Sequence, residues 1–234
     1  MPTQQSKTRR ALAALLVLVG GLSGCRPGMP YVELPPIEKG APLSDSRFLI
    51  AALEKRRDAF EDLRALTRVS LQRGKEKVRL KEVLLLHREP RIRIEALGLL
   101  GQPFLYLTSD GTEFVIYAAN EGRYYRGTLT PEKFERFLGL SLALPQLVAI
   151  LSGNLPYPVD DELENAWYNA DRGEYSMSMA SKGGRYRLMA WIDASTLVPT
   201  RCAIVEGRAI VLDVTYGDHT AVGGYLLPRQ LVVR

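Results

Sequence analysis

Apolar residues near the start of the folded region recur at helical spacing. Ser44-Asp45-Ser46 is typical of a helix N-cap, and charged residues fill the positions between the apolar ones. The apolar stripe consists of Leu49, Leu53, Phe60 and Leu63. This pattern predicts an amphipathic helix of about five turns that packs one face against a sheet.

From about Ala65 the apolar period changes to that of β-strands. Arg73-Gly74-Lys75-Glu76 and Ser109-Asp110-Gly111-Thr112 are expected turns, the second of the Asp-Gly hairpin kind. The strands are expected over residues 69–72, 78–87, 91–96, 104–108, 113–118 and 123–127. Several short strands joined by tight turns indicate an antiparallel meander.

Two short helices are predicted next. The first begins at Thr130-Pro131-Glu132, with Thr130 as its cap, and the second runs from Pro145 until Gly153 ends it. The apolar positions are Phe134, Phe137 and Leu138 in the first helix, and Leu147, Val148, Ile150 and Leu151 in the second.

The second half of the sequence returns to strand patterns. Strands are expected over residues 167–169, 175–180, 185–191, 200–206, 209–216 and 230–233. The turns between them are expected at Gly183-Gly184, Glu206-Gly207-Arg208 and Gly217-Asp218. Because no Gly-rich linker separates the halves, the sequence predicts one domain over residues 44–234.

The N-terminal 24 residues have the pattern of a lipoprotein signal peptide. Lys7, Arg9 and Arg10 precede a nine-residue apolar run, residues 11–19, which is too short to span a bilayer. Leu22-Ser23-Gly24-Cys25 follows as a lipobox, so we expect cleavage between Gly24 and Cys25 and a lipid on the Cys25 sulfur. The alternative is an ordinary secretory signal with an incidental cysteine.

Removing the leader changes the charge balance. Residues 1–24 contain three basic and no acidic side chains, so the formal net charge falls from +5 to about +2. A net charge this small gives little electrostatic reason to expect nucleic-acid binding. Residues 25–43 are rich in proline and are expected to form an extended tether. With Cys25 lipidated, Cys202 has no cysteine partner, and we expect it inside a strand as a small apolar residue.

Enzyme chemistry is not expected. His87 and His219 lie far apart in the sequence, no paired His/Cys spacing predicts a metal site, and no Gly-rich phosphate loop occurs. Asp160-Asp161-Glu162 is expected to be a solvated turn, with weak cation binding as the alternative. No cofactor is expected.

Three stretches together resemble the LolA/LolB superfamily of lipoprotein carriers and receptors. Residues 91–103 look like the receptor's strand, apolar loop and returning strand. Residues 130–156, with Leu138-Gly139-Leu140 and Gly153-Asn154-Leu155-Pro156, resemble its paired lid helices. Tyr225-Leu226-Leu227-Pro228-Arg229 fits its late strand. The resemblance is closest to LolB-like outer-membrane lipoproteins and spans roughly residues 45–234.

The resemblance implies a mainly β (α+β) fold: a strongly curved, incompletely closed antiparallel β-barrel with an N-terminal helix and short lid helices. An apolar cavity under such a lid suits an acyl chain. It also implies an outer-membrane location facing the periplasm, since Arg26 rather than Asp follows the lipidated cysteine. The implied partners are acylated lipoproteins and a periplasmic carrier protein, and we expect a monomer.

Two groups of apolar residues are candidates for function. Leu97, Leu99 and Leu100, set between Gly98 and Gly101, are expected to form a protruding tip that touches membrane or lipid; the alternative is that the turn folds back into the core. The candidate cavity-lining residues, which would look the same as core residues, are Ile92, Ile94, Phe104, Tyr106, Phe134, Phe137, Leu147 and Ile150.

The resemblance implies a receptor that binds the acyl chains of lipoproteins and assists their insertion, and this is the first hypothesis. Two other hypotheses remain at this point: an assembly lipoprotein that uses the same fold to bind proteins, and a carrier of free lipid or glycolipid. A catalytic role ranks behind all three.

Overall fold

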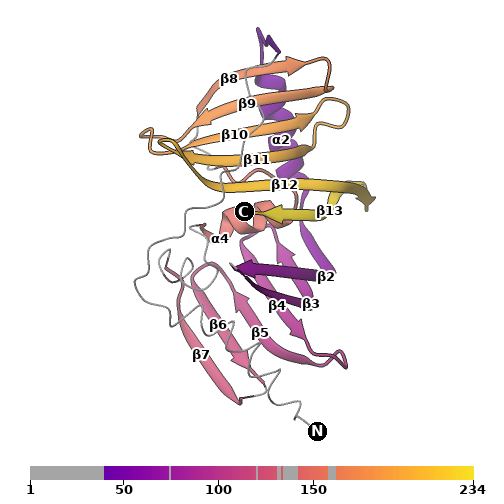
Figure 1. Ribbon diagram of the computed structural model, residues 1–234, viewed down its shortest axis with the longest axis vertical. Helices are drawn as coiled ribbons and strands as arrows, with labels where there is room; N and C mark the ends of the chain where they lie inside the picture. Colours follow the sequence, from indigo (N-terminus) through magenta and orange to yellow (C-terminus); the bar gives the residue numbers. More distant parts are fainter. Residues whose placement is uncertain (1–39, 74, 120, 131–132, 134–141, 158–161) are drawn as a thin grey trace. The chain divides into compact units, whose positions relative to one another are not determined.

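The computed structural model describes residues 40–234 except residues 74, 120, 131–132, 134–141 and 158–161 (Figure 1). The predicted leader, Cys25 and most of the tether lie outside the described residues. The described chain is mainly β and its strands are antiparallel, as the sequence predicts. The strands form two sheets, and the described residues include two helices. Neither helix is long and apolar enough to cross a bilayer.

The described chain divides into two compact units. Unit 1 comprises residues 62–145, and unit 2 comprises residues 40–61 together with residues 146–234. The predicted domain boundaries, after residues 24 and 43, stay predictions.

Unit 1 is a six-stranded meander in which each strand pairs with the next along the chain. The strands are β2 (Asp62–Arg73), β3 (Glu76–His87), β4 (Arg91–Leu97), β5 (Pro103–Ser109), β6 (Glu113–Ala118) and β7 (Arg123–Thr128). All six predicted strands of this part are present. The main difference is β2, which begins seven residues before the expected Val69 because the preceding helix is shorter than predicted.

Cross-strand pairing gives the sheet of unit 1 two chemically different faces. Residues directly opposite each other in an antiparallel pair share a face, so Leu63, Leu86 and Ile92 lie on one face. This face, the apolar face, also carries Ala65, Leu84, Ile94, Ala96, Leu105, Leu107, Phe114, Ile116 and Ala118. The opposite face carries most of the charged residues of β2, β3 and β4.

Unit 2 contains a seven-stranded antiparallel sheet in the order β1-β8-β9-β10-β11-β12-β13. The strands are β1 (Ala41–Pro42), β8 (Glu162–Asn169), β9 (Glu174–Ala180), β10 (Arg187–Asp193), β11 (Pro199–Glu206), β12 (Ala209–Val222) and β13 (Tyr225–Val233). β1 ties the end of the expected tether to β8, where Gly40 brings the backbone against Tyr168.

The prediction of a turn at Gly217-Asp218 is wrong. β12 continues through both residues, Gly217 pairs with Gln230 of β13, and the turn lies six residues later at Gly223-Gly224. Asp218 adopts a positive φ of 54°, so the strand is locally irregular there without changing its register. A Gly-Asp pair is a common turn signal, but cross-strand pairing with β13 overrides it here.

The core of unit 2 is built from rows of side chains that cross the sheet. One row runs Ala166, Met177, Ala190, Cys202 and Val214 across β8 to β12, and each of these residues is nearly or fully buried. Cys202 is fully buried in β11 and makes no disulfide, which confirms the expectation of a small apolar role.

Helix α2 (Arg47–Ala59) covers this face of the sheet (Figure 1). Leu49 and Leu53 are buried, and Phe48 meets Tyr175 of β9 with ring centroids 5.4 Å apart. The helix has 13 residues, so it is shorter than the predicted five turns. Phe60 already has an extended backbone and Leu63 belongs to β2, although both continue the helical spacing.

Helix α4 (Leu144–Leu151) ends as the sequence predicts, at Gly153. The Asn154 N–H donates to the Ala149 carbonyl at 2.7 Å and the Gly153 N–H to the Ile150 carbonyl at 3.0 Å. This pair of bonds, with Gly153 at φ 78°, is a Schellman motif. A Cβ on Gly153 would lie only 2.6 Å from Cδ of Pro228, so this glycine is required for packing as well as for conformation.

We therefore expect Gly153→Ala to destabilise the protein far more than Gly173→Ala. Both glycines have a left-handed backbone, which costs an alanine about 1–2 kcal/mol. A Cβ on Gly173 meets nothing within 4 Å, whereas overpacking at Gly153 adds about 1–3 kcal/mol. Urea unfolding of both variants measures the difference, and equal losses would contradict the packing role.

Candidate functional site

The turn between β4 and β5 exposes two adjacent leucines. The Gly98 N–H donates to the Gln102 carbonyl at 2.8 Å, and the Gly101 N–H donates to the Gly98 carbonyl at 3.0 Å, which closes the turn. Leu99 is 93% exposed and Leu100 is 89% exposed. The side chains of these two residues therefore do not fold back into the core, and we call them the leucine tip.

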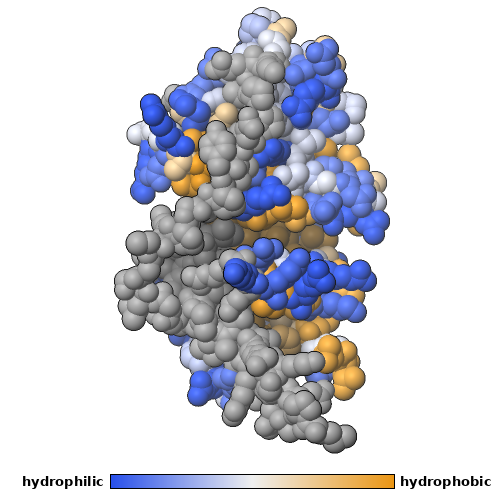
Figure 2. Space-filling model, viewed as in Figure 1, coloured by the Kyte–Doolittle hydropathy of each residue, from blue (hydrophilic) through white to orange (hydrophobic). Residues whose placement is uncertain are grey.

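Leu97 differs from its two neighbours. It is half-buried at the end of β4, where it pairs with Pro103 across a register shift in the ladder. The predicted tip of three leucines is therefore reduced to two, with Leu97 at its base. Figure 2 shows hydrophobic surface on the lower part of unit 1, where Figure 1 draws the loop between β4 and β5.

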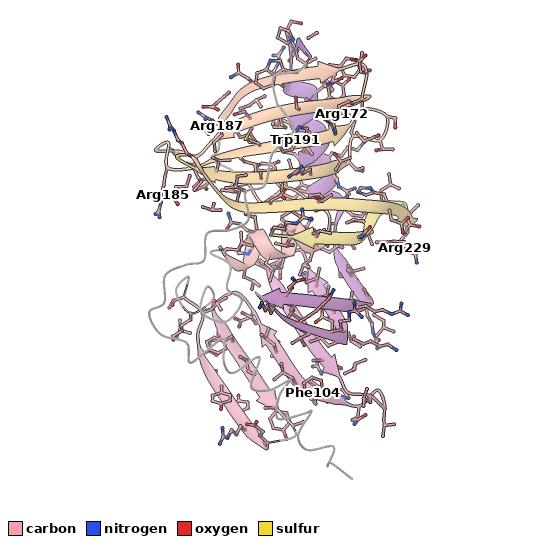
Figure 3. All side chains as sticks on the ribbon, viewed as in Figure 1. Phe104, Arg172, Arg185, Arg187, Trp191 and Arg229 are labelled. Carbon is pink, nitrogen blue, oxygen red and sulfur yellow. The ribbon has the colours of Figure 1, made fainter. Side chains whose placement is uncertain are left out.

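The four candidate cavity residues on β4 and β5 do not share a face. Ile94 pairs with Leu107, whereas Tyr106 pairs with Glu95, so the alternation of each strand separates the two sets. Ile92 and Ile94 lie on the apolar face, with Ile92 only 3% exposed. Tyr106 lies on the charged face, where Arg93 stands 5.7 Å from its ring, and Phe104 shares that face two residues earlier in β5 (Figure 3).

Sequence alternation alone could not reveal this separation. The register pairs even-numbered residues of β4 with odd-numbered residues of β5. Residues 92 and 94 of β4 therefore lie on the opposite face from residues 104 and 106 of β5. Only the register, which depends on the length and geometry of the turn, decides which sets meet. A single wall formed by all four residues is therefore not possible within this sheet.

A surface depression of about 450 Å³ lies in unit 1 at the ends of β2 to β5. Of the predicted cavity residues on these strands, it contains Ile92 alone. Its lining residues are Asp62, Leu63, Arg64, Leu85, Leu86, His87, Arg91, Ile92, Arg93, Thr108, Ser109 and Asp110. The lining mixes leucines with arginines because adjacent residues from both faces of the sheet contribute to it at the strand ends.

The predicted lid residues are described only in part. Phe134 and Phe137 lie outside the described residues. The start of the first lid helix is described at its cap, where the Lys133 N–H donates to Thr130 Oγ1 at 3.3 Å, as expected of an N-cap. In α4, Ile150 is fully buried and Leu147 is half-buried.

A buried polar cluster follows α4, and sequence reasoning did not find it. The Tyr216 hydroxyl donates to the Asn154 carbonyl at 2.8 Å, and the Tyr225 hydroxyl donates to Asn154 Oδ1 at 3.1 Å. Arg56 of α2 donates to the Gly153 and Leu226 carbonyls, and its guanidinium stacks 4.3 Å from the Tyr225 ring. Burial lowers the pKa of Arg56 and raises that of Tyr216 well above its usual value.

One sequence signal points to this cluster. Arg56 stands three residues after Leu53 and four before Phe60, so it occupies a position on the apolar stripe of the helix. A charged residue on such a stripe requires buried hydrogen-bond acceptors. The carbonyls after α4 and in β13 supply them.

The two histidines lie in different units and have different surroundings. His87 Nδ1 accepts a hydrogen bond from the Glu89 N–H at 3.1 Å. Burial, with a smaller contribution from Arg56, lowers the pKa of His219. The described side chains include no group of three or more His, Cys, Asp or Glu residues able to hold a metal ion. Residues 160–161 of the acidic run lie outside the described part of the chain.

Comparisons with known proteins identify the fold. No family model and no curated protein matches the sequence. A LolA superfamily protein from Nitrosomonas europaea is 11% identical, with a TM-score of 0.52 over 79% of this chain and 84% of that chain. A domain from Vibrio parahaemolyticus that is named for outer membrane lipoprotein sorting is also 11% identical, with a TM-score of 0.57 over 80% of this chain and 83% of that chain.

The chain has the LolA-superfamily fold. This finding confirms the resemblance drawn from the strand–loop–strand, paired-helix and late-strand motifs. At such low identity the likeness concerns the fold alone. Closer kinship with LolB-like receptors stays a prediction.

We expect Cys202 of this LolA-like fold to resist alkylation in the folded protein. Burial raises its pKa to about 12, and only the thiolate reacts, so at pH 8 almost none of the buried thiol is reactive. In residues 26–234, Cys202 is the sole cysteine. Iodoacetamide labelling followed by mass measurement tests this, with urea-unfolded protein as the positive control. Equally fast labelling of folded and unfolded protein would contradict the buried position.

Proposed function

We propose that this protein is an outer-membrane lipoprotein, anchored through a lipid on Cys25 and facing the periplasm, that receives acylated lipoproteins from a periplasmic carrier. It binds their acyl chains and assists their insertion into the membrane. The proposal involves no catalytic step and no cofactor.

The leucine tip is the observation that carries the proposal. Moving a leucine side chain out of water is worth about 1.5–3 kcal/mol, and Leu99 and Leu100 together leave nearly their whole surface in water. Two adjacent exposed leucines do not stabilise the fold. A contact with lipid would recover this free energy.

The fold and the expected anchor support the same role. Solved relatives of this fold include a domain named for outer membrane lipoprotein sorting. The lipobox at residues 22–25 would hold the protein at a membrane through its acyl chains. A tip that contacts lipid is useful only if the protein is kept near a bilayer, and the anchor provides that.

The capture of cargo tests the proposal directly. The protein used is residues 26–234, which contain every described helix and strand. We expect it to take an acylated lipoprotein from a purified LolA-type carrier. It should not take a non-acylated form of the same lipoprotein. Co-purification and native mass spectrometry measure the transfer. Equal capture of both forms would instead identify a protein-binding module, and free lipid in place of lipoprotein would identify a lipid carrier.

The tip variant Leu99→Ser with Leu100→Ser separates insertion from capture. We expect it to capture acylated cargo from the carrier but to deliver at least about 10-fold less of it to vesicles, because the tip loses the free energy of burying two leucines. Its urea stability should be unchanged, since both side chains are exposed. Val222→Ser, at a valine 53% exposed in unit 2, is the matched control and should deliver normally. Normal delivery by the tip variant would remove the leading support for the proposal.

A further inference from the structure

The outer half of the β2–β3 hairpin carries a strip of positive charge on one face. Arg68 pairs directly with Lys81, Ser70 with Arg79, and Gln72 with Lys77. The four basic residues therefore stand on the same face of the hairpin, and all four are exposed. We call Arg68, Lys77, Arg79 and Lys81 the cationic strip.

Stability does not explain the cationic strip. Like charges placed directly opposite each other in an antiparallel pair are destabilising, and Arg68 opposite Lys81 is such a pair. None of the ion pairs formed by the described side chains involves a member of the strip.

The described carboxylates nearby do not neutralise it. Glu82 stands on the opposite, apolar face, where it accepts a hydrogen bond from Thr67 Oγ1 at 3.1 Å, and burial raises its pKa. Glu95 of β4 forms an ion pair with Arg93, in which Arg93 Nε lies 2.6 Å from Glu95 Oε1. Among the described side chains, the strip is therefore a row of four cations that no carboxylate pairs, and an external anion would offset their repulsion.

The cationic strip lies at the same end of the sheet as the leucine tip. Lys81 pairs with Leu97, the residue that leads into the turn carrying Leu99 and Leu100. Beyond that point β3 continues past the end of β4 with Arg79 and Lys77. Figure 2 shows hydrophilic surface over β2 and β3, with hydrophobic surface beside it where the β4–β5 loop lies.

We propose that the cationic strip docks unit 1 on an anionic phospholipid surface, with lipid phosphates against the basic side chains and the leucine tip inserted between the lipids. Exposed cations beside exposed apolar side chains are the combination that binds anionic bilayer surfaces. The depression in unit 1 lies at the opposite ends of these strands, away from the strip. A row of exposed charges on a strand pair suits a broad anionic surface.

This inference rests on the proposed function only for placing the protein beside a membrane. The docking itself is a property of residues 26–234 and needs neither cargo nor carrier. It predicts binding to vesicles of equal parts phosphatidylcholine and phosphatidylglycerol, and much weaker binding to phosphatidylcholine alone. It also predicts that added salt weakens the binding, because exposed charges are screened.

Removing the strip tests the inference. The variant replaces all four residues by glutamine: Arg68→Gln, Lys77→Gln, Arg79→Gln and Lys81→Gln. We expect its affinity for the anionic vesicles to fall roughly 600-fold, because each of the four basic residues near such a surface contributes about a fivefold gain and the gains multiply. Vesicle co-sedimentation measures the affinity, and circular dichroism and urea unfolding verify the fold.

A matched control removes the same charge from unit 2. It replaces four exposed basic residues that take part in none of the described ion pairs: Lys55→Gln, Lys182→Gln, Arg208→Gln and Arg229→Gln. Figure 3 labels Arg229 on β13. We expect this variant to bind anionic vesicles almost as well as the unaltered protein. Equal losses in both variants, or equal binding of the unaltered protein to neutral and anionic vesicles, would overturn the inference.

The outcomes separate this inference from the proposed function. If cargo capture fails but vesicle binding still depends on the strip, the receptor proposal falls and the docking surface stands. If the strip variant binds anionic vesicles normally and instead fails to take cargo from the carrier in the absence of vesicles, the strip binds the acidic surface of a protein, and the lipid-docking inference is wrong.

Discussion

The guanidinium of Arg56 is the constraint on which unit 2 depends. It leaves α2 on the side that faces the sheet and reaches two backbone carbonyls, at 3.3 Å to Gly153 and 2.6 Å to Leu226. A partly buried cation that pairs with none of the described carboxylates is costly unless oriented dipoles replace its water. The C-terminal end of α4 provides such a dipole, because its last carbonyls carry partial negative charge.

This requirement fixes much of the surrounding structure. For the Gly153 carbonyl to face Arg56, the chain after α4 must turn through a left-handed residue, and the close approach of Pro228 leaves no room for a Cβ there. The turn then presents the Asn154 carbonyl to Tyr216 and the Asn154 side chain to Tyr225. One arginine thus joins α2, α4 and β13, while the apolar rows of the sheet supply most of the buried area.

The sequence predicted the elements better than their boundaries and contacts. The alternation of apolar and polar residues, together with the Asp-Gly turn before it, predicted β6 at its observed limits. The helix was predicted too long because Phe60 and Leu63 keep the apolar spacing of α2 after the backbone has become extended. Arg56 and Tyr216 could not be paired from the sequence, since 160 residues separate them and the contact depends on how α2 lies on the sheet. The separation of Ile94 from Tyr106 depends on register, which the spacing of apolar residues does not encode.

The leucine tip was predicted because its signal is local: glycines flank leucines in a turn. The cationic strip was missed for the opposite reason. In the sequence its four members are interspersed with apolar residues and with Glu76 and Glu82, so the stretch looks like the mixed charges of a solvated hairpin. Strand alternation turns Glu82 to the other face and leaves Arg68 opposite Lys81. Folding thus concentrates positive charge beside exposed leucines. Both features are unfavourable for an isolated protein in water, and a bilayer with anionic headgroups over an apolar interior is a surface that would satisfy both.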